Sequence, residues 1–321
     1  MPWLKRLLSD IKTTKIHDIK TTKIHTAKYK FVMRKLFRKQ ILLLTVLAVF
    51  FGCSANGGSK DIVKGLIDVA TKSGVAQDKA GASAVEAAAT ADPDGLEIPA
   101  PLKGVKEQIL SRRGYTVSYN ADTKIPNWVA WRLDASRLDG DAKRPRKVFH
   151  EDEDVAEPRA TDWDYYSSGY DRGHMCPAGD NKWDKEAMWE SFLFTNICPQ
   201  NPSLNRGDWN EMENACRRWA QQYGKVYVVC GPILYKGKHK TIGKNKVVVP
   251  EAFFKVVLCM EGTPKAIGFI YKNEDGNRPK GDYVNSVDEV ERITGIDFFP
   301  SLPDDVEKKV EKTASPEDWG I

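Results

Sequence analysis

The sequence predicts one mixed α/β domain of the α+β class, preceded by segments that have no core of their own. Strand-like runs rich in aromatic and β-branched residues recur after Val105. One long amphipathic helix interrupts them. The first hundred residues differ in composition from the rest, so one catalytic domain over residues 105–321 is a better prediction than two domains.

Residues 1–32 carry a tandem repeat. The octapeptide "DIKTTKIH" spans Asp10–His17 and recurs unchanged at Asp18–His25. Two copies are too few for a solenoid, so the segment is interpreted as disordered or as upstream sequence included in the reading frame. In the second interpretation, translation begins at Met33.

Residues 33–52 have the layout of a secretory signal. A basic start from Arg34 to Lys39 precedes an apolar run, Ile41–Phe51. These eleven residues fall short of the roughly 20 that span a bilayer, which favours a signal over a membrane anchor. The following Gly-Cys resembles a bacterial lipoprotein signal, in which a lipidated Cys53 attaches the exported protein to a membrane. The predicted location is periplasmic, outer-membrane, cell-surface or secreted.

Residues 53–104 are interpreted as a flexible tether. They are rich in Ala, Gly, Ser and Asp, as in "GASAVEAAATADPDG", which has no aromatic residue to bury.

Charge is divided unevenly along the chain. Residues 1–52 hold 12 Lys/Arg against 2 Asp/Glu, and the remainder holds 37 against 42, a net charge of −5. A globally basic nucleic-acid binder is therefore excluded. A local basic track remains: residues 214–250 contain eight Lys/Arg and no acid, typical either of a solvated loop or of a phosphate-contacting surface.

The predicted strands are bounded by turn formers and read "YTVSYN", "WVAWRL", "KVYVVCGPILY", "FFKVVLCM" and "KAIGFIYKN". Between the second and third lies the helix, "GDWNEMENACRRWAQQY", with Asp208 predicted as its N-cap. Its apolar residues recur at intervals of three and four. Glu213 and Arg217 fall on one face of it, four residues apart.

Five cysteines remain after Cys53: Cys176, Cys198, Cys216, Cys230 and Cys259. No CxxC spacing occurs, which disfavours a structural zinc site. Export would permit disulfides, although five thiols leave one unpaired. Cys230 and Cys259 each end a strand-like run, so these two residues could be neighbours.

Histidine narrows the search for a catalytic base. After residue 52 only His150, His174 and His239 remain, and imidazole is the side chain suited to proton transfer near neutral pH. His150 and His239 lie in charged loops, where a surface role suffices. His174 follows Arg172 and a glycine. The glycine allows the backbone to turn or to come close to a ligand, and the planar guanidinium of Arg172 can donate hydrogen bonds to phosphate oxygens.

A second set of polar residues follows in "FTNICPQNPSLNRGDWNEME". Asn196 and Asn205 lie there just ahead of the helix that carries Glu213. Oxygen donors suit a hard cation such as Mg²⁺, which needs few protein ligands, whereas a lone loop asparagine is usually a turn former.

With these motifs the chain resembles the DNA/RNA non-specific endonucleases of the ββα-metal, or His-Me finger, type. "DRGH" at Asp171–His174 matches the family signature, and Thr195, Asn196, Pro199, Gln200, Asn205, Trp209 and Glu213 match its "TN…PQ…N…W…E" series. Further segments that resemble the family are "IPNWVAW", "GPIL", "VPEAFFKVV" and "SVDEVERITGIDFFPSLPD". The resemblance covers nearly the whole domain and implies a central antiparallel sheet with a ββα-metal motif.

The resemblance also implies roles. His174 would be the general base, Asn205 the direct ligand of one Mg²⁺, for which Mn²⁺ substitutes, and Glu213 the holder of a metal-bound water. Asn196 would orient the site, with a link to His174. Arg172 and Arg217 would bind phosphate, and Asp171 would have a structural role. Cys176 and Cys198 are also assigned a structural role, because the mechanism of the family needs no thiol.

The predicted function is Mg²⁺-dependent hydrolysis of DNA and RNA to 5′-phosphate products, without sequence preference because no residue set for reading base edges is evident. No obligate protein partner is implied. Two alternatives remain: an exported lipoprotein that binds nucleic acid without cutting it, and a phosphodiesterase for small nucleotides, which would have a closed pocket.

Overall fold

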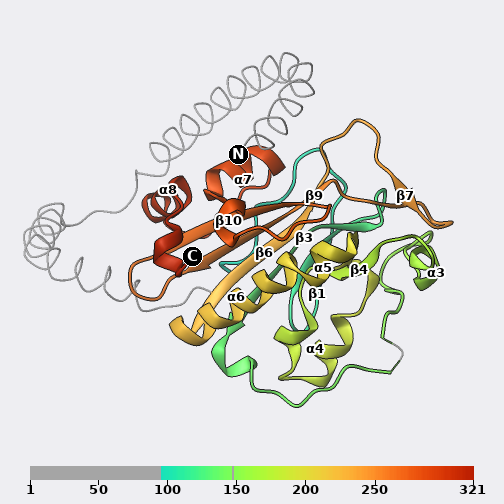
Figure 1. Cartoon of the computed structure of the whole chain (residues 1–321), viewed down its shortest axis with the longest axis horizontal. Coiled ribbons are helices and arrows are strands. Elements are labelled where there is room, and N and C mark those ends of the chain that lie inside the picture. Colours follow the sequence, from blue (N-terminus) through green and yellow to red (C-terminus); the bar gives the residue numbers. More distant parts are fainter. Residues whose placement is uncertain (1–94, 147) are drawn as a thin grey trace, which may run out of the picture. The chain divides into compact units, whose positions relative to one another are not determined.

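The computed structural model describes residues 95–146 and 148–321 (Figure 1). The octapeptide repeat, the signal-like segment, Cys53 and most of the predicted tether lie outside the described residues. Leu96 is fully buried, and the Ala100 N–H donates to the Asp297 carbonyl at 2.9 Å. Residues 95–104 therefore pack on the domain, ahead of its predicted start at 105. None of the helices in the described ranges is long and apolar enough to cross a membrane.

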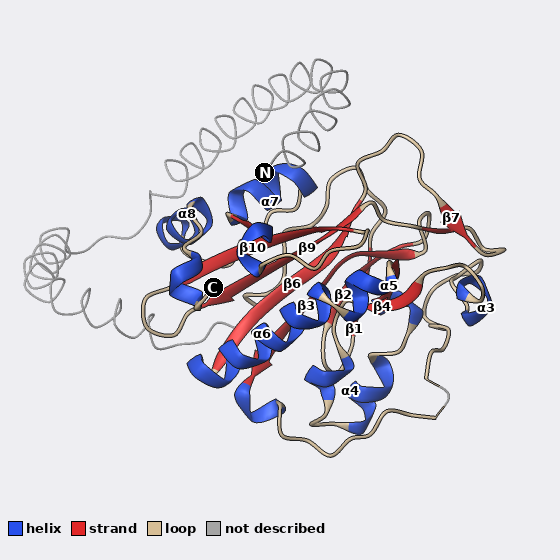
Figure 2. Cartoon of the chain, viewed as in Figure 1, coloured by secondary structure: helices blue, strands red, loops and turns tan. Residues whose placement is uncertain are grey.

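Seven strands form one sheet in the order β1-β2-β3-β6-β9-β10-β11 (Figure 2). Each neighbouring pair is antiparallel. The predicted mixed fold with a central antiparallel sheet is thus confirmed, and all five predicted strands belong to it. The strands are β1 Gln108–Ser111, β2 Thr116–Asn120, β3 Ile125–Asp134, β6 Lys225–Ile233, β9 Ala252–Cys259, β10 Lys265–Lys272 and β11 Val284–Asn285.

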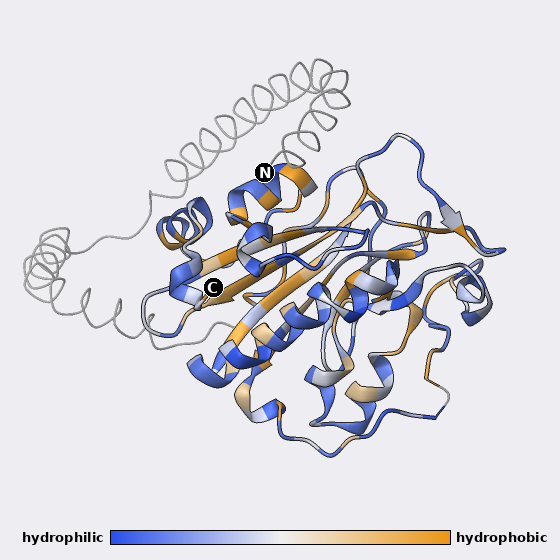
Figure 3. Ribbon diagram, viewed as in Figure 1, coloured by the Kyte–Doolittle hydropathy of each residue, from blue (hydrophilic) through white to orange (hydrophobic). Residues whose placement is uncertain are grey.

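Both faces of the central strands are buried, which explains their continuous apolar runs. On β3, Trp131 belongs to one hydrophobic core and Trp128 to the other. Helix α6 (Asp208–Tyr223) packs on the first face, whereas α7 (Val287–Thr294) and α8 (Asp304–Lys312) pack on the second. Figure 3 shows largely hydrophobic central strands, whereas the helices carry both hydrophilic and hydrophobic residues.

Helix α6 confirms the predicted periodicity but not its predicted cap. Gly207 occupies the N-cap position. The Asp208 carboxylate instead accepts hydrogen bonds from the Asn277 N–H, at 2.7 Å, and from the Tyr283 hydroxyl. It therefore ties the helix start to a distant loop. The buried face carries Trp209, Met212, Cys216 and Trp219.

A smaller hairpin lies on the α6 side of the sheet. Strands β4 (Asp171–His174) and β5 (Ile197–Gln200) pair antiparallel, and α5 (Pro202–Arg206) and α6 follow directly. Met175 and Cys198 join the core that contains Trp209. This strand-strand-helix unit brings the end of β4 beside both helices.

The remaining elements are short and lie around these two sheets. They are α3 Asp162–Tyr165, α4 Lys185–Glu190, the pair β7 Thr241–Ile242 and β8 Val247–Val248, and 3-10 turns at Ala135–Arg137, Ala178–Asn181, Phe194–Asn196, Lys280–Tyr283 and Pro316–Trp319.

The five cysteines of the described residues are all buried and unpaired. Cys230 lies opposite Lys255 in the β6–β9 register, four residues along β9 from Cys259, so the two predicted neighbours are separated. Burial raises the pKa of the Cys176 and Cys198 thiols well above its usual value. These thiols are therefore neutral side chains of the core, in line with their assigned structural role.

Candidate active site

The strand-strand-helix unit forms one wall of an open pocket of about 860 Å³. Strand β4, helix α5 and helix α6 each contribute side chains to it, and Phe149 and residues 142–144 also line it. The lining residues are Ala142, Lys143, Arg144, Phe149, Asp171, Arg172, His174, Pro177, Ala178, Gly179, Lys182, Met188, Asn205, Arg206, Asn210, Glu213 and Arg217.

His174 lies at the end of β4, where the strand opens into the pocket. Its ring packs against Phe149 and Phe192, with centroids 5.4 and 4.9 Å away. Its Nε2 is buried and has no hydrogen-bond partner among the described residues. Burial, with a smaller contribution from the Arg144 charge, lowers the pKa of His174 to about 3. The imidazole is therefore neutral at physiological pH and can accept a proton.

The glycine before His174 is required by close packing between the two strands of the hairpin. A Cβ on Gly173 would lie 2.6 Å from Gln200 Cβ and would also contact Gln200 Oε1. Gln200 is fully buried and cannot move aside. Glycine at this position thus lets β4 approach β5 and fixes the place of the next residue.

Asn205 is oriented by a carboxylate. Its Nδ2 donates to Asp171 Oδ2 at 3.0 Å, which leaves Oδ1 available as a ligand. Arg206 donates to both oxygens of the same carboxylate, at 2.8 Å each. Asp171 thereby links β4 to α5 and holds the side-chain amide of Asn205 in one orientation, which is a structural role.

Glu213 lies on α6 in the same pocket. Burial raises its pKa to about 7, and the charge of Lys255 opposes that rise. Lys255 is fully buried, with Nζ 4.2 Å from the Trp209 ring centroid and no hydrogen-bond partner among the described residues. The sequence pattern did not indicate this lysine, because it reads as one polar residue inside an apolar strand.

Asn196 differs from its expected place in the catalytic set. It is fully buried and does not line the pocket. Its side chain accepts from the Cys176 N–H at 2.9 Å and donates to the carbonyls of Cys176 and Ser191, each at 2.8 Å. The expected link to His174 is therefore made through the backbone after the histidine, and the asparagine positions that segment.

The two arginines expected to bind phosphate both line the pocket, and both have an acidic neighbour. Arg172 Nε lies 2.7 Å from Asp162 Oδ1, an ion-pair contact without hydrogen-bond alignment. Arg217 donates to Asp180 Oδ1 at 2.7 Å. These contacts fix the orientation of both guanidinium groups in the pocket lining.

The positive charge of the pocket comes mainly from residues that the sequence analysis missed. Six of the lining residues are Lys or Arg and two are Asp or Glu, although the chain after residue 52 is acidic. Of the eight cations in the basic track at 214–250, the pocket includes Arg217 alone. Lys143, Arg144 and Lys182 come from segments without a regular pattern, so only the fold gathers them.

The other two histidines lie outside this pocket. His150 stacks on Trp189 with a centroid distance of 3.9 Å, and His239 Nδ1 lies 3.0 Å from Glu251 Oε1. Each has a structural partner, as expected for a role away from the chemistry.

The donor set fits a hard cation. The oxygen of Asn205 and the carboxylate of Glu213 line one pocket, and the nearby sulfurs are buried in the core. Oxygen donors with room for water are the environment that Mg²⁺ prefers.

Comparison with known proteins agrees with this geometry. The family model described as DNA/RNA non-specific endonuclease matches residues 94–305. Mitochondrial endonuclease G of Bos taurus is 34% identical over 209 residues, which cover 61% of this chain and 70% of that protein. Mitochondrial nuclease EXOG of Danio rerio is 37% identical over 218 residues, covering 62% and 64%. A nuclease of Nostoc sp. is 33% identical over 216 residues, covering 63% and 77%.

A solved structure shares the fold. The crystal structure of the EndoG/EndoGI complex aligns with a TM-score of 0.58 and 30% identity, over 61% of this chain and 87% of that one. The strand-strand-helix unit is accordingly the ββα-metal motif of endonuclease G. The chain belongs to the DNA/RNA non-specific endonuclease family and is a nuclease.

Proposed function

We propose that this nuclease hydrolyses the phosphodiester bonds of both DNA and RNA with one Mg²⁺, with Mn²⁺ as a substitute. The observation that carries the proposal is the meeting of three groups in one cation-rich pocket: a neutral imidazole at His174, an oriented amide at Asn205 and a carboxylate at Glu213.

His174 is assigned the role of general base. Its neutral imidazole accepts a proton from the water that attacks phosphorus. The negative charge of a bound phosphate stabilises the resulting imidazolium, which raises the proton affinity of a ring that burial otherwise keeps weakly basic. The aromatic neighbours Phe149 and Phe192 fix the ring during this transfer.

Asn205 would hold the cation directly, and Glu213 would hold one of its waters. When bound, Mg²⁺ supplies Lewis-acid stabilisation of charge on the phosphate and on the departing oxygen. Asp171 keeps the Asn205 oxygen directed to that task, while Arg172 and Arg217 neutralise phosphate charge at the rim. Contacts of this kind are made to the phosphates of the nucleic acid and therefore do not depend on its base sequence.

The shape of the pocket separates this proposal from its alternatives. The pocket is an open depression, which suits a polymer better than a small nucleotide held in a closed cavity. A protein that only bound nucleic acid would gain nothing from an unpartnered imidazole next to oriented oxygen donors.

Export with a lipid anchor at Cys53 remains part of the proposal. It is supported by the signal-like layout of residues 33–52 and the Gly-Cys that ends it.

The test is cleavage of plasmid DNA and of RNA by the purified protein, with Mg²⁺ or with EDTA, beside Asn205→Ala. We expect degradation of both substrates with Mg²⁺, none with EDTA, and a higher Mg²⁺ requirement or lost activity in the variant. Intact nucleic acid in every lane from a folded protein would refute the proposal. A wild-type Mg²⁺ response in Asn205→Ala would refute the assigned ligand.

A further inference from the structure

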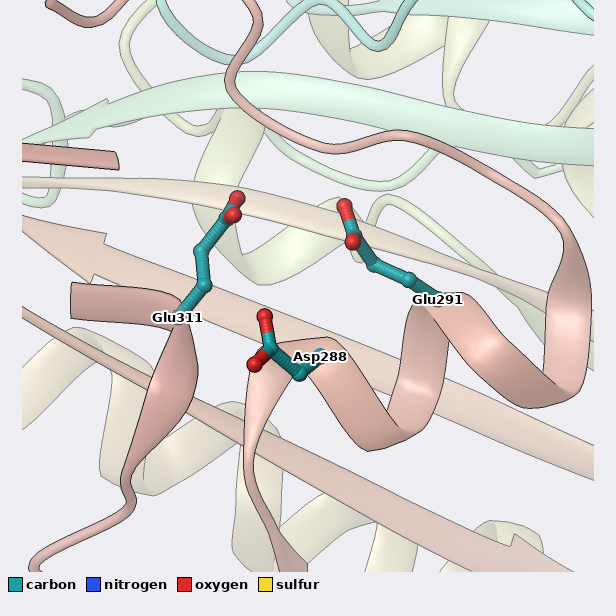
Figure 4. A group of neighbouring side chains, drawn as sticks. All are labelled: Asp288, Glu291 and Glu311. Atoms are coloured by element: carbon teal, nitrogen blue, oxygen red, sulfur yellow. The ribbon is translucent and has the colours of Figure 1, made fainter. Parts of the chain in front are cut away.

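Three carboxylates meet on the face of the sheet opposite to the pocket. Asp288 and Glu291 lie three residues apart on α7, and Glu311 lies on α8. Figure 4 shows the three side chains pointing toward one common space. One oxygen from each lies within 4.8 Å of the others. None of the three lines the nuclease pocket.

Glu311 is the unusual member of this cluster. Its side chain is 6% exposed, and Oε1 is buried without a hydrogen-bond partner among the described residues. The neighbouring charges that act on it come from Glu291, Glu307, Asp288 and Asp297, and all are negative. Burial and these like charges raise the pKa of Glu311 to about 9, so the ionised carboxylate is costly here unless a cation replaces the proton.

Glu291 is already positioned for a ligand. Its Oε1 accepts the Phe298 N–H at 2.7 Å, which fixes the carboxylate at the C-terminal side of α7. The other oxygen takes no part in this bond. Asp288 lies at the exposed edge, where water can complete a coordination sphere.

We propose that Asp288, Glu291 and Glu311 bind one Ca²⁺ ion that joins α7 to α8. Calcium accepts flexible oxygen coordination at about 2.3–2.6 Å, so its ligand oxygens lie at most about 5 Å apart, and water completes the set. Mg²⁺ retains most of its water and is usually bound through one or two carboxylates, so a cluster of three carboxylates suits Ca²⁺ better. The site is structural and independent of the nuclease reaction.

The test is thermal unfolding of the chelator-treated full chain with and without Ca²⁺. At a Ca²⁺ concentration about 100-fold above its Kd, we expect Tm to rise by about 5–10 °C. Asn205→Ala, which lacks the proposed catalytic ligand, should show the same rise. Glu311→Gln should lose it, whereas Asp305→Asn, a control at an exposed acid on α8 outside the cluster, should retain it.

Calorimetric titration of Asn205→Ala with Ca²⁺ should give one site, and the added Asp288→Asn change should weaken it. Equal Tm shifts in wild type and Glu311→Gln, or no shift in wild type at millimolar Ca²⁺, would overturn the proposal. Because Glu311→Gln removes a buried charge, we expect it to fold and to cleave DNA with Mg²⁺ at the wild-type rate below its Tm.

Discussion

Replacing Gly173 with alanine should disrupt the hairpin that positions His174, the proposed general base. Gly173 does not have a positive φ, so the backbone itself accepts alanine. The added Cβ would lie 2.6 Å from Gln200 Cβ and 2.9 Å from its Cδ, and it would also contact Oε1. Overpacking of this kind costs about 1–3 kcal/mol, because the two strands must separate.

For a domain of this size the cost corresponds to a fall in Tm of about 2–12 °C. A shift of His174 by about 1 Å would also lower turnover by up to about 100-fold. Scanning calorimetry and initial cleavage rates measure the two effects. Gly237→Ala is the matched control, because an added Cβ there meets nothing within 4 Å.

A second substitution separates this packing effect from a general loss of stability. Gln200→Gly removes the three atoms nearest to the new Cβ, so the double variant should be less destabilised than the sum of the single changes. Gln200→Ala removes Oε1 and Cδ but retains the Cβ at 2.6 Å, so it should relieve the overlap only in part. An unchanged Tm in Gly173→Ala, or no coupling with Gln200→Gly, would refute this reasoning.

Three further predictions concern the chemistry of the pocket. Asp171→Ala should weaken Mg²⁺ activation by about 10–100-fold, measured as the Mg²⁺ concentration for half-maximal rate, because Asn205 loses the carboxylate oxygen that accepts its Nδ2 hydrogen bond; an unchanged requirement would contradict the proposed structural role of Asp171. Since the pKa of Glu213 is raised to about 7, Mg²⁺ affinity should increase as pH rises through 7, when this carboxyl loses its proton. Lys255→Met removes a charge that lowers that pKa, so titrations at several pH values should move the midpoint upward; a downward shift would contradict the electrostatics. Arg144→Ala should weaken DNA binding and reduce the salt slope of log K by about one, and an unchanged slope would place this cation outside the contact surface.

The sequence predicted the elements whose patterns are local. Burial on both faces makes β6 and β9 continuous apolar runs, and the three-four spacing of Trp209 and Met212 marks α6. The histidine proposed as the general base could be singled out because the sequence after residue 52 contains only three histidines. Its neighbours on α5 and α6 were recognised from their order along the chain.

Features that depend on distant contacts could not be predicted in this way. Asp208 resembles an N-cap by position, yet it binds Asn277 and Tyr283, about 70 residues away. Asn196 resembles a catalytic amide, but its bonds to Cys176 form only when the segment after β4 packs against the 3-10 turn at Phe194–Asn196. The positive charge of the pocket likewise comes from separate segments that only the tertiary fold brings together.

The most direct test of the account compares cleavage and binding by His174→Ala. With Mg²⁺ and saturating enzyme, we expect the single-turnover rate on DNA to fall by at least about 100-fold, because the general base is lost. The Kd for the same DNA should stay within about twofold of the wild-type value, because the phosphate-binding cations are unchanged. A wild-type cleavage rate in this variant would contradict the central claim that the imidazole at the end of β4 activates the attacking water.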